Sequence, residues 1–576
     1  MKAKFALLCI AVLASNAAFC QTYIKNVTVV DVVKGKLIAD QTVTINGDII
    51  SDIAASKKVN IPANATVIDG AGKFLMPGLT DAHVHFFQSG GLYTRPDGLD
   101  LRKYVPYDQE IAWGHEHMDE FLRRYMRAGI TTVVDPGATF NYLKQRDSLK
   151  NKSYAPAIYM AGPLITTYEP GVFKGLKNDE PFNLATTPDE ARAYVQKQLP
   201  YHPDFIKIWY IVLGKDKEGA ARKFEPIVKA AIDEAHKSNL RVAVHATERI
   251  TAQLAVESGC DYLVHEVEDE VVTNDFIKLL ISHKIVLCPT LIVEDGFVNT
   301  FGQTTRPTYY EFTRSNPEQL GSLFDLKHLA DTGLVNFYKK RIAALSAYFA
   351  HGDSVRMVNL KKMADAGVNI AAGTDAGNPG VMHATSLFAE LTAMKQSGLS
   401  NWQILRSATV GGAMAVAKEN EFGSITKGKK ADMILLDANP ADSLEALKKI
   451  SLVINMGNVI SPDTLIKETP VALVQRQLNA YNARNIEAFL EPYADDVEFY
   501  DYPDKLLGKG KDALSKVYTA LFNKFTALHS ELKGRMVQGN VVIDNERVTG
   551  IGKSIIKGIV IYNMENDKIK KVYIVE

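Results

Sequence analysis

Residues 74–85 read FLMPGLTDAHVH, a short apolar run that ends on two histidines, His83 and His85. In an extended strand the side chains alternate between two faces, so residues two apart point to the same side. Two imidazoles on one side can hold a single metal ion. Taken alone, the pair is better explained as a chance pair on the surface. A metal site is indicated only if other segments supply further ligands.

Seven more candidate strands follow this one, with helical stretches between them. Such an alternation is typical of β/α units around a parallel sheet. Eight units in a row predict an α/β fold with a closed (β/α)₈ barrel over residues 74–420, whose chemistry gathers at the carboxyl ends of the strands. The predicted strands are Phe74–Leu79, Ile130–Val134, Ala157–Ala161, Phe205–Trp209, Leu240–Val244, Tyr262–Val264, Ile285–Cys288 and Val368–Ala372.

Polar residues lie in or directly after several of these apolar strands. Lys207 lies within one of them, where burying a lone ammonium costs roughly several kcal/mol, so it needs a compensating partner. His245 and His265 end two consecutive strands, and Asp375 follows the last strand. Because strand ends meet at the barrel rim, these residues predict a metal site together with the histidine pair. The alternative is a set of histidines satisfied within the core.

The remaining segments predict smaller units around the barrel. Residues 21–73 and 421–460 alternate like strands and predict one composite β-sandwich. Residues 291–365 are too long for a plain connection and carry helical spacing, so we expect a helical lid over the site. A polar linker, 461–470, precedes an α+β unit over 471–576, which opens with an amphipathic helix.

Within this last unit the apolar segments predict four strands. They are Val497–Tyr502, Met536–Val542, Ile555–Tyr562 and Ile569–Val575.

Composition limits the classes of function. The 576 residues carry 66 basic and 66 acidic side chains, and this neutrality disfavours a nucleic-acid binder. Only Cys260 and Cys288 lie beyond the first twenty residues, too few for a disulfide framework, and both begin apolar stretches typical of buried, inert thiols.

The first twenty residues predict a cleaved signal peptide. Lys2 and Lys4 precede a ten-residue apolar run, which is followed by small residues, and cleavage is expected after Ala18 or Cys20. The run is too short to span a bilayer, so we expect no membrane insertion and a periplasmic or secreted protein. A lipid anchor on Cys20 is the alternative, which the bulky Phe19 before it disfavours.

Over residues 23–460 the chain resembles the amidohydrolase superfamily, and within it the imidazolonepropionase-like and prolidase-like hydrolases. The resemblance rests on the strand-end His245 and His265 and on several short motifs. These motifs are PGLTDAHVH at 77–85, GITTVVD at 129–135, GTD at 373–375, and GSI at 423–425 before GKKAD at 428–432.

The resemblance implies a ligand set. It assigns one ion to His83, His85 and Asp375 and a second ion to His245 and His265. Lys207, carboxylated by CO₂, would bridge the two, which turns a costly buried cation into an anion between cations. Imidazole and carboxylate ligands suit Zn²⁺ best, with Mn²⁺, Co²⁺ or Fe²⁺ as alternatives. If Lys207 stays a free amine, the site could hold only one metal.

The expected reaction is hydrolysis of an amide or other C–N bond in a small molecule, such as a dipeptide or N-acyl amino acid. A metal-bound hydroxide would attack the carbonyl, with Asp375 as general base and then as acid toward the leaving amine. Tyr210, His383 and Arg95 are candidate substrate contacts, although His383 is equally well explained by packing or capping. Lactone or ester hydrolysis at the same site, and a non-catalytic metal- and ligand-binding protein, are the alternatives.

Residues 470–576 resemble the SnoaL-like cone fold of the nuclear-transport-factor-two superfamily. Such folds serve as enzymes, ligand pockets or dimer modules, and this segment shows no evident acid–base pair. We expect an accessory binding or oligomerisation role rather than a second active site. A homo-oligomer is expected.

Overall fold

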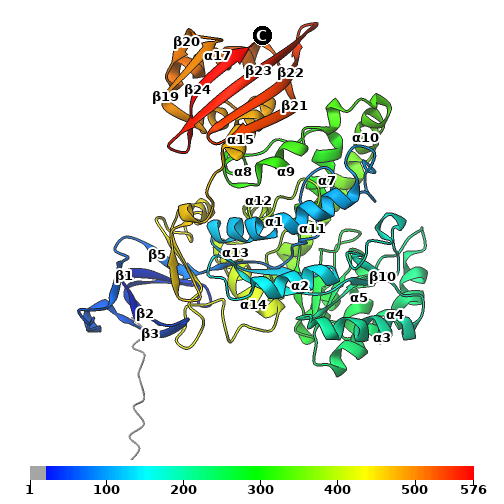
Figure 1. Ribbon diagram of the computed structural model, residues 1–576. Helices are drawn as coiled ribbons and strands as arrows, with labels where there is room; N and C mark the ends of the chain where they lie inside the picture. The colour runs from blue at the N-terminus through cyan, green and yellow to red at the C-terminus, as the bar shows by residue number, and fades with distance from the viewer. Residues whose placement is uncertain (1–20, 576) are drawn as a thin grey trace, which may run out of the picture.

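The computed structural model describes residues 21–575 (Figure 1). The predicted signal peptide, residues 1–20, lies outside the described residues. Figure 1 shows the N-terminal strands gathered at one corner, a helix-rich middle region, and the C-terminal sheet at another corner. The protein is a mixed α/β structure with a β-rich C-terminal unit.

The first sheet is built from segments far apart in the sequence. Its strands follow the order β18-β17-β16-β5-β1-β2-β3, with β4 beside β1. The strands form one hydrogen-bonded path, in which β5 pairs with β1 on one side and with β16 on the other. This pairing joins the N-terminal segment to residues after the middle region, and the predicted sandwich stays a prediction. The bounds are β1 Thr22–Asp31, β2 Lys36–Asn46, β3 Ile49–Ala55, β4 Thr66–Asp69, β5 Phe74–Pro77, β16 Met433–Leu436, β17 Ile450–Asn455 and β18 Asn458–Ile460.

The strand predicted at Phe74–Leu79 is wrong as a single element. Its first part is β5 in the N-terminal sheet, and the chain then crosses at Gly78 into β6 (Leu79–Asp81) of a different sheet. A Cβ on Gly78 would lie 2.1 Å from Thr131 Oγ1, so only glycine allows this close passage. The crossing brings the residues that follow β6 into the middle of the molecule.

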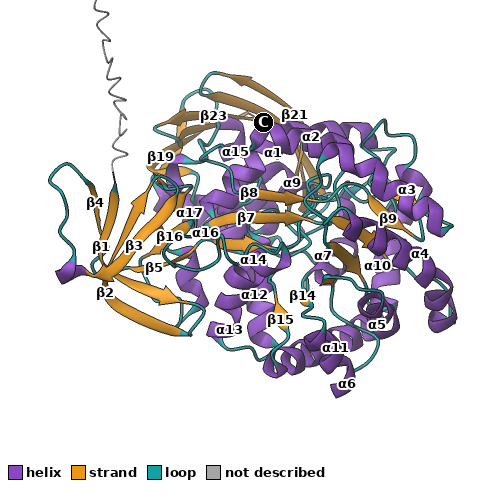
Figure 2. Ribbon diagram, turned by 90° about the horizontal axis from the view of Figure 1, so that it is seen from below, coloured by secondary structure: helices purple, strands orange, loops and turns teal. Residues whose placement is uncertain are grey.

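The middle region contains two sheets of parallel strands (Figure 2). Three strands run in the order β6-β7-β8, and seven run in the order β10-β9-β11-β12-β13-β14-β15. The two short strands β9 and β10 are absent from the sequence prediction. The bounds are β7 Ile130–Asp135, β8 Ala157–Met160, β9 Leu164–Thr166, β10 Phe182–Leu184, β11 Ile206–Trp209, β12 Val242–His245, β13 Tyr262–Val264, β14 Val286–Cys288 and β15 Asn369–Ile370.

Backbone hydrogen bonds connect these two sheets on both sides. The Ala82 amide donates to the Ala372 carbonyl over 2.9 Å, next to β6 and β15. On the other side the Asp204 amide donates to the Met160 carbonyl over 2.9 Å, next to β8 and β11. The carboxyl ends of the strands therefore face one common region. Closure into a single eight-stranded barrel stays a prediction.

Helices alternate with these strands and bury their apolar faces against them. The helix α3 begins with a capping box, in which Thr187 and Glu190 satisfy each other's backbone amides. The bounds are α1 Tyr107–Arg127, α2 Phe140–Leu149, α3 Pro188–Gln198, α4 Lys217–Lys237, α5 Arg249–Glu257, α6 Asn274–Ser282, α12 Ser386–Gln396, α13 Asn401–Arg406 and α14 Gly412–Ala415.

The long segment between β14 and β15 is helical, as its spacing predicts. It contains five helices: α7 Val293–Gly302, α8 Tyr309–Arg314, α9 Pro317–Ser322, α10 Thr332–Ala344 and α11 Ser346–Ala366.

The C-terminal unit packs three helices on a six-stranded sheet of order β20-β19-β24-β23-β22-β21. The strand predicted at Met536–Val542 is wrong, because the chain turns at Gly539 and Asn540 and forms an antiparallel hairpin there. The bounds are α15 Pro470–Ala483, α16 Ile486–Leu490, α17 Lys511–Lys524, β19 Tyr493–Asp501, β20 Lys505–Lys509, β21 His529–Gln538, β22 Val541–Ile551, β23 Ser554–Glu565 and β24 Lys568–Val575.

The C-terminal unit sits on the helical insertion, with α15 next to α8 and α9 (Figure 1). Asn479 Nδ2 donates to the Pro317 carbonyl over 2.6 Å. Leu473 and Val474 of α15 share one hydrophobic core with Phe312 and Leu320 of the insertion. The two units are therefore joined by packing as well as by the chain.

Replacing Phe489 tests the core of the C-terminal unit. This ring is fully buried among Tyr481, Tyr493 and Tyr518. Phe489→Ala should cost about 3–5 kcal/mol in the free energy of unfolding of this unit, because a cavity replaces the ring. The exposed control Val517→Ala should cost under about 0.5 kcal/mol. Denaturant unfolding of the full chain measures both, and equal costs would contradict the described packing.

Candidate metal centre

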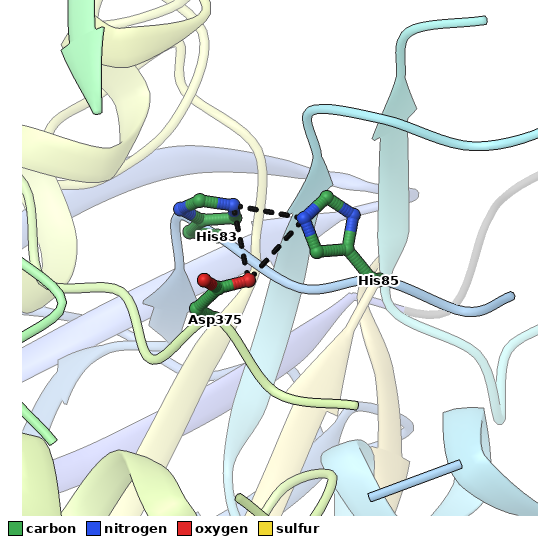
Figure 3. Close-up of side chains that lie close together, drawn as sticks. All are labelled: His83, His85 and Asp375. Atoms are coloured by element: carbon green, nitrogen blue, oxygen red, sulfur yellow. Dashed lines mark hydrogen bonds and ion pairs between the residues drawn. The ribbon is translucent and has the colours of Figure 1, made fainter. Parts of the chain in front are cut away.

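Three side chains converge where β6 and the segment after β15 meet (Figure 3). His83 Nε2 lies 3.1 Å from His85 Nε2. Asp375 Oδ1 lies 3.3 Å from His83 Nε2 and 3.2 Å from His85 Nε2. The Asp375 amide donates to the His83 carbonyl over 2.7 Å, which fixes the carboxylate beside the two rings.

This geometry fits a bound cation. Ligand atoms of a tetrahedral ion with bonds of about 2.1 Å lie roughly 3.4 Å apart, close to the separations of these three atoms. All three side chains are buried, and Asp375 Oδ1 has no hydrogen-bond partner in the described residues. Buried polar atoms normally have partners, so a carboxylate oxygen facing two imidazoles indicates a place for a metal ion.

Neighbouring groups orient the histidine rings. His85 Nδ1 lies 2.9 Å from the Gly137 carbonyl and 3.3 Å from Asp135 Oδ1, which leaves Nε2 for the centre. His265 Nδ1 lies 2.6 Å from Thr290 Oγ1 in the same way. Burial lowers the pKa of His85, but the facing carboxylates of Asp135 and Asp375 outweigh it and raise this pKa to about 9.

The structure brings the other predicted ligands to the same place. The ring centroids of His83 and His265 are 5.1 Å apart, and those of His245 and His265 are 4.3 Å apart. His265 Nε2 lies 3.9 Å from Asp375 Oδ2. Lys207, in β11, is 1% exposed, and burial lowers its pKa to about 8 although Asp375 opposes the shift.

All six predicted ligands line one cavity of about 380 Å³. Lys207 lies in β11 and His245 ends β12, whereas the other four follow β6, β13 and β15, all near the carboxyl ends of parallel strands. His265 and Asp375 both have left-handed backbones, with φ of 76° and 59°. Non-glycine residues rarely adopt this conformation, which is concentrated at functional sites.

Two buried carboxylates that support the centre are absent from the predicted site. Asp135 accepts hydrogen bonds from the Phe86 and Gly137 amides, each over 3.1 Å, and faces His85. Asp81 accepts hydrogen bonds from the Thr374 amide over 3.0 Å and from the Thr374 hydroxyl over 2.8 Å, and burial raises its pKa to about 7. Asp135 is the last residue of β7, and the same kind of strand-end position identifies His245 and His265 as candidate ligands.

The three predicted substrate contacts have different outcomes. Arg95 lines the cavity. Tyr210 does not, because its buried hydroxyl donates to the Ala221 carbonyl in the helical layer, which corrects that expectation. His383 also lies outside the cavity lining: its ring stacks on Phe86 at 5.5 Å, and its Nδ1 lies 2.9 Å from the Tyr125 hydroxyl. The packing interpretation of His383 therefore holds.

The helical insertion supplies one wall of the cavity. Glu294 and Phe297 reach it from α7, and Phe349 and Arg356 reach it from α11. The sequence predicts the insertion as a lid, which stays a prediction, and it identifies none of these side chains, because helical spacing alone does not say which face of a helix meets the cavity. Among the helices of residues 21–575, none has both the length and the apolar character needed to span a membrane.

Known proteins with similar structures share this architecture. A solved Xaa-Pro dipeptidase with bound methionine matches with a TM-score of 0.58 at 22% identity, covering 77% of this chain and 100% of that one. The solved Aspergillus niger ochratoxinase matches with a TM-score of 0.56 at 18% identity, covering 77% and 95%. At these identities the similarity shows the fold alone.

The sequence comparisons show the family. Ochratoxinase of Aspergillus niger is 25% identical over 406 residues, which are 65% of this chain and 72% of that protein. Imidazolonepropionase of Picrophilus torridus is 22% identical, covering 73% and 91%. Residues 474–572 match the SnoaL-like domain, and residues 74–460 match the amidohydrolase family, as the sequence motifs predict. The chain therefore belongs to the amidohydrolase family and is a hydrolase that acts on carbon–nitrogen bonds.

Proposed function

We propose that the protein is a metal-dependent hydrolase that cleaves an amide bond of a small molecule, such as a dipeptide or an N-acyl amino acid. The observation that supports this most directly is the buried set of His83, His85 and Asp375, whose ligand atoms lie within 3.3 Å of one another. The relatives named ochratoxinase and imidazolonepropionase support a substrate of small-molecule size.

The donor set indicates how a metal would be held. His83, His85 and Asp375 would take one ion, and His245 and His265 would take a second, with carboxylated Lys207 between them. Neutral imidazoles and carboxylates suit Zn²⁺ best, with Mn²⁺, Co²⁺ or Fe²⁺ as alternatives. When bound, such an ion polarises a carbonyl group and makes water more acidic.

Burial supports the neutral state that imidazole ligands need. It lowers the pKa of His83, of His245 and of His265 well below the ordinary value. The same burial lowers the pKa of Lys207 to about 8, which increases the fraction of free amine that can react with CO₂.

Asp375 is the residue placed to move a proton. Its Oδ1 faces the two histidines, while its Oδ2 faces His265 at 3.9 Å. In the proposed reaction this carboxylate takes a proton from the attacking water and delivers it to the nitrogen of the leaving amine. The cleaved C–N bond thus yields a carboxylic acid and an amine, and Asp375 returns to its starting state.

Three wider features belong to the proposal. The backbone bonds that join the two middle sheets support a closed TIM-type barrel. The residue pattern of the first twenty positions supports secretion or a periplasmic location. The SnoaL-like unit is assigned an accessory role in ligand binding or in formation of a homo-oligomer.

Asp375→Asn tests the proposed proton transfer. Loss of the base should reduce kcat by about 10²–10⁴-fold, while the variant keeps its metal because the amide oxygen can still coordinate. The measurement is turnover across a dipeptide and N-acyl amino acid panel together with elemental analysis. Asp275→Asn, on the exposed start of α6, is the matched control. Wild-type turnover in Asp375→Asn would show that the proposed mechanism is wrong.

Asp135→Asn tests the support of the metal ligands. The change removes the charge that faces His85 Nδ1 but keeps the shape of the side chain. We expect metal affinity to fall by about 10–100-fold, because groups that orient a ligand contribute this much. Competition with a chelator followed by elemental analysis measures it, beside the exposed control Asp119→Asn. Unchanged affinity would contradict the role given to Asp135.

A further inference from the structure

Carboxyl groups collect on one wall of the cavity, beside the metal centre. Glu266 and Glu268 follow β13, and Glu294 reaches the same cavity from α7. Arg356 Nη1 donates to Glu268 over 3.0 Å and also to Glu294, and Arg356 Nη2 donates to Asp353. One guanidinium thus serves three carboxyl groups, so carboxyl groups outnumber cationic groups around Arg356.

Glu266 is an independent sign that a ligand belongs there. Its side chain lines the cavity and is only 1% exposed. One oxygen, Oε1, accepts from the Val267 amide over 3.1 Å, whereas Oε2 has no hydrogen-bond partner in the described residues. A buried carboxyl oxygen without a donor is costly, so a donor on a bound molecule would offset this cost.

The positive side chains of the cavity are already engaged. Arg95 is bound by both oxygens of Asp97 over 2.8 and 2.7 Å and donates to Asn378 over 2.6 Å. Lys207 lies within the proposed ligand set. Among the described carboxyl groups of this wall, the oxygen without a hydrogen-bond partner is Glu266 Oε2. Burial, followed by the neighbouring Glu294, raises the pKa of Glu268 to about 7, and a bound cation would favour the charged form of this group.

Aromatic rings complete the surroundings of this wall. Phe297 and Phe349 line the cavity from the same two helices that carry Glu294 and Arg356. An ammonium or guanidinium group is attracted to the face of an aromatic ring as well as to a carboxylate. Carboxylates and rings together suit an organic cation better than a metal ion.

We propose that the substrate carries an ammonium or guanidinium group and that this group docks against Glu266, Glu268 and Glu294. The inference rests on the proposed amide hydrolysis and names the substrate class of that same site. A bound cation supplies the missing donor to Glu266 and gives the carboxyl groups that share Arg356 a second positive partner. A neutral molecule of the same shape gives no positive partner to Glu266 or to the carboxyl groups that share Arg356.

Charge-matched substrates test the proposal. Ala-Arg and Arg-Ala are compared with Ala-citrulline and citrulline-Ala, because citrulline has nearly the shape of arginine without its charge. For the scissile bond that the protein accepts, we expect the arginine substrate to have a kcat/KM at least about tenfold higher. Glu266→Gln and Glu294→Gln should reduce this preference, mainly through KM, while Glu257→Gln on the exposed end of α5 should leave it unchanged.

A binding measurement distinguishes failure of the cation-docking inference from failure of the proposed amide hydrolysis. Calorimetric titration of the metal-loaded full chain compares Nα-acetylarginine amide with Nα-acetylcitrulline amide. Tighter binding of the arginine ligand without hydrolysis of any dipeptide supports the docking site and counts against the proposed function. Equal or tighter binding of the citrulline ligand overturns the inference. Preference for an acidic ligand, Nα-acetylglutamate amide, also overturns it and assigns the wall to Arg356 as a carboxylate site.

Discussion

The site depends on one backbone hydrogen bond, from the Asp375 amide to the His83 carbonyl. These two residues are almost three hundred positions apart, and they belong to the segments after β15 and β6. The bond holds the Asp375 carboxylate against two imidazoles that come from the other segment. Asp375 has a left-handed backbone at this position, so the local chain is held in a costly conformation by the surrounding structure. Without this contact the histidine pair would be an ordinary pair on a strand end.

Around this contact the protein excludes water and arranges charge. Lys207, His83, His85 and His265 are buried, and His245 is half-buried. Burial lowers the pKa of His83, His245 and His265, which favours their neutral form, and it brings the amine of Lys207 toward its free form. Asp135 and Thr290 turn the outer ring nitrogens away from the centre, so the inner nitrogens remain available. The same burial makes each unpaired oxygen of the cavity expensive, and the acidic wall is therefore informative about the molecule that fills it.

Much of this site could be predicted because its residues stand at the ends of apolar strands. His245 and His265 illustrate this, since their position in parallel strands brings them together whatever the exact loop structure. Lys207 is identified by the free-energy cost of burying an ammonium group in an apolar strand, and the structure shows that this side chain is buried. The sequence does not show where Tyr210 and His383 point, because a loop residue near a strand end can face either the cavity or the surrounding layer, and periodicity does not distinguish these. Nor does it show the split at Gly78, because the apolar run continues across it, whereas the change of sheet depends on packing against Thr131.

The helical insertion touches two neighbours at once. Its helices α8 and α9 share a core with α15 of the SnoaL-like unit, while α7 and α11 carry side chains that line the cavity. The cavity wall and the core shared with α15 thus belong to different helices of one inserted segment. The C-terminal unit is fitted to the outer helices of that segment, and none of its described residues lines the cavity. Exchange of this unit between related enzymes would require the insertion to be repacked with it.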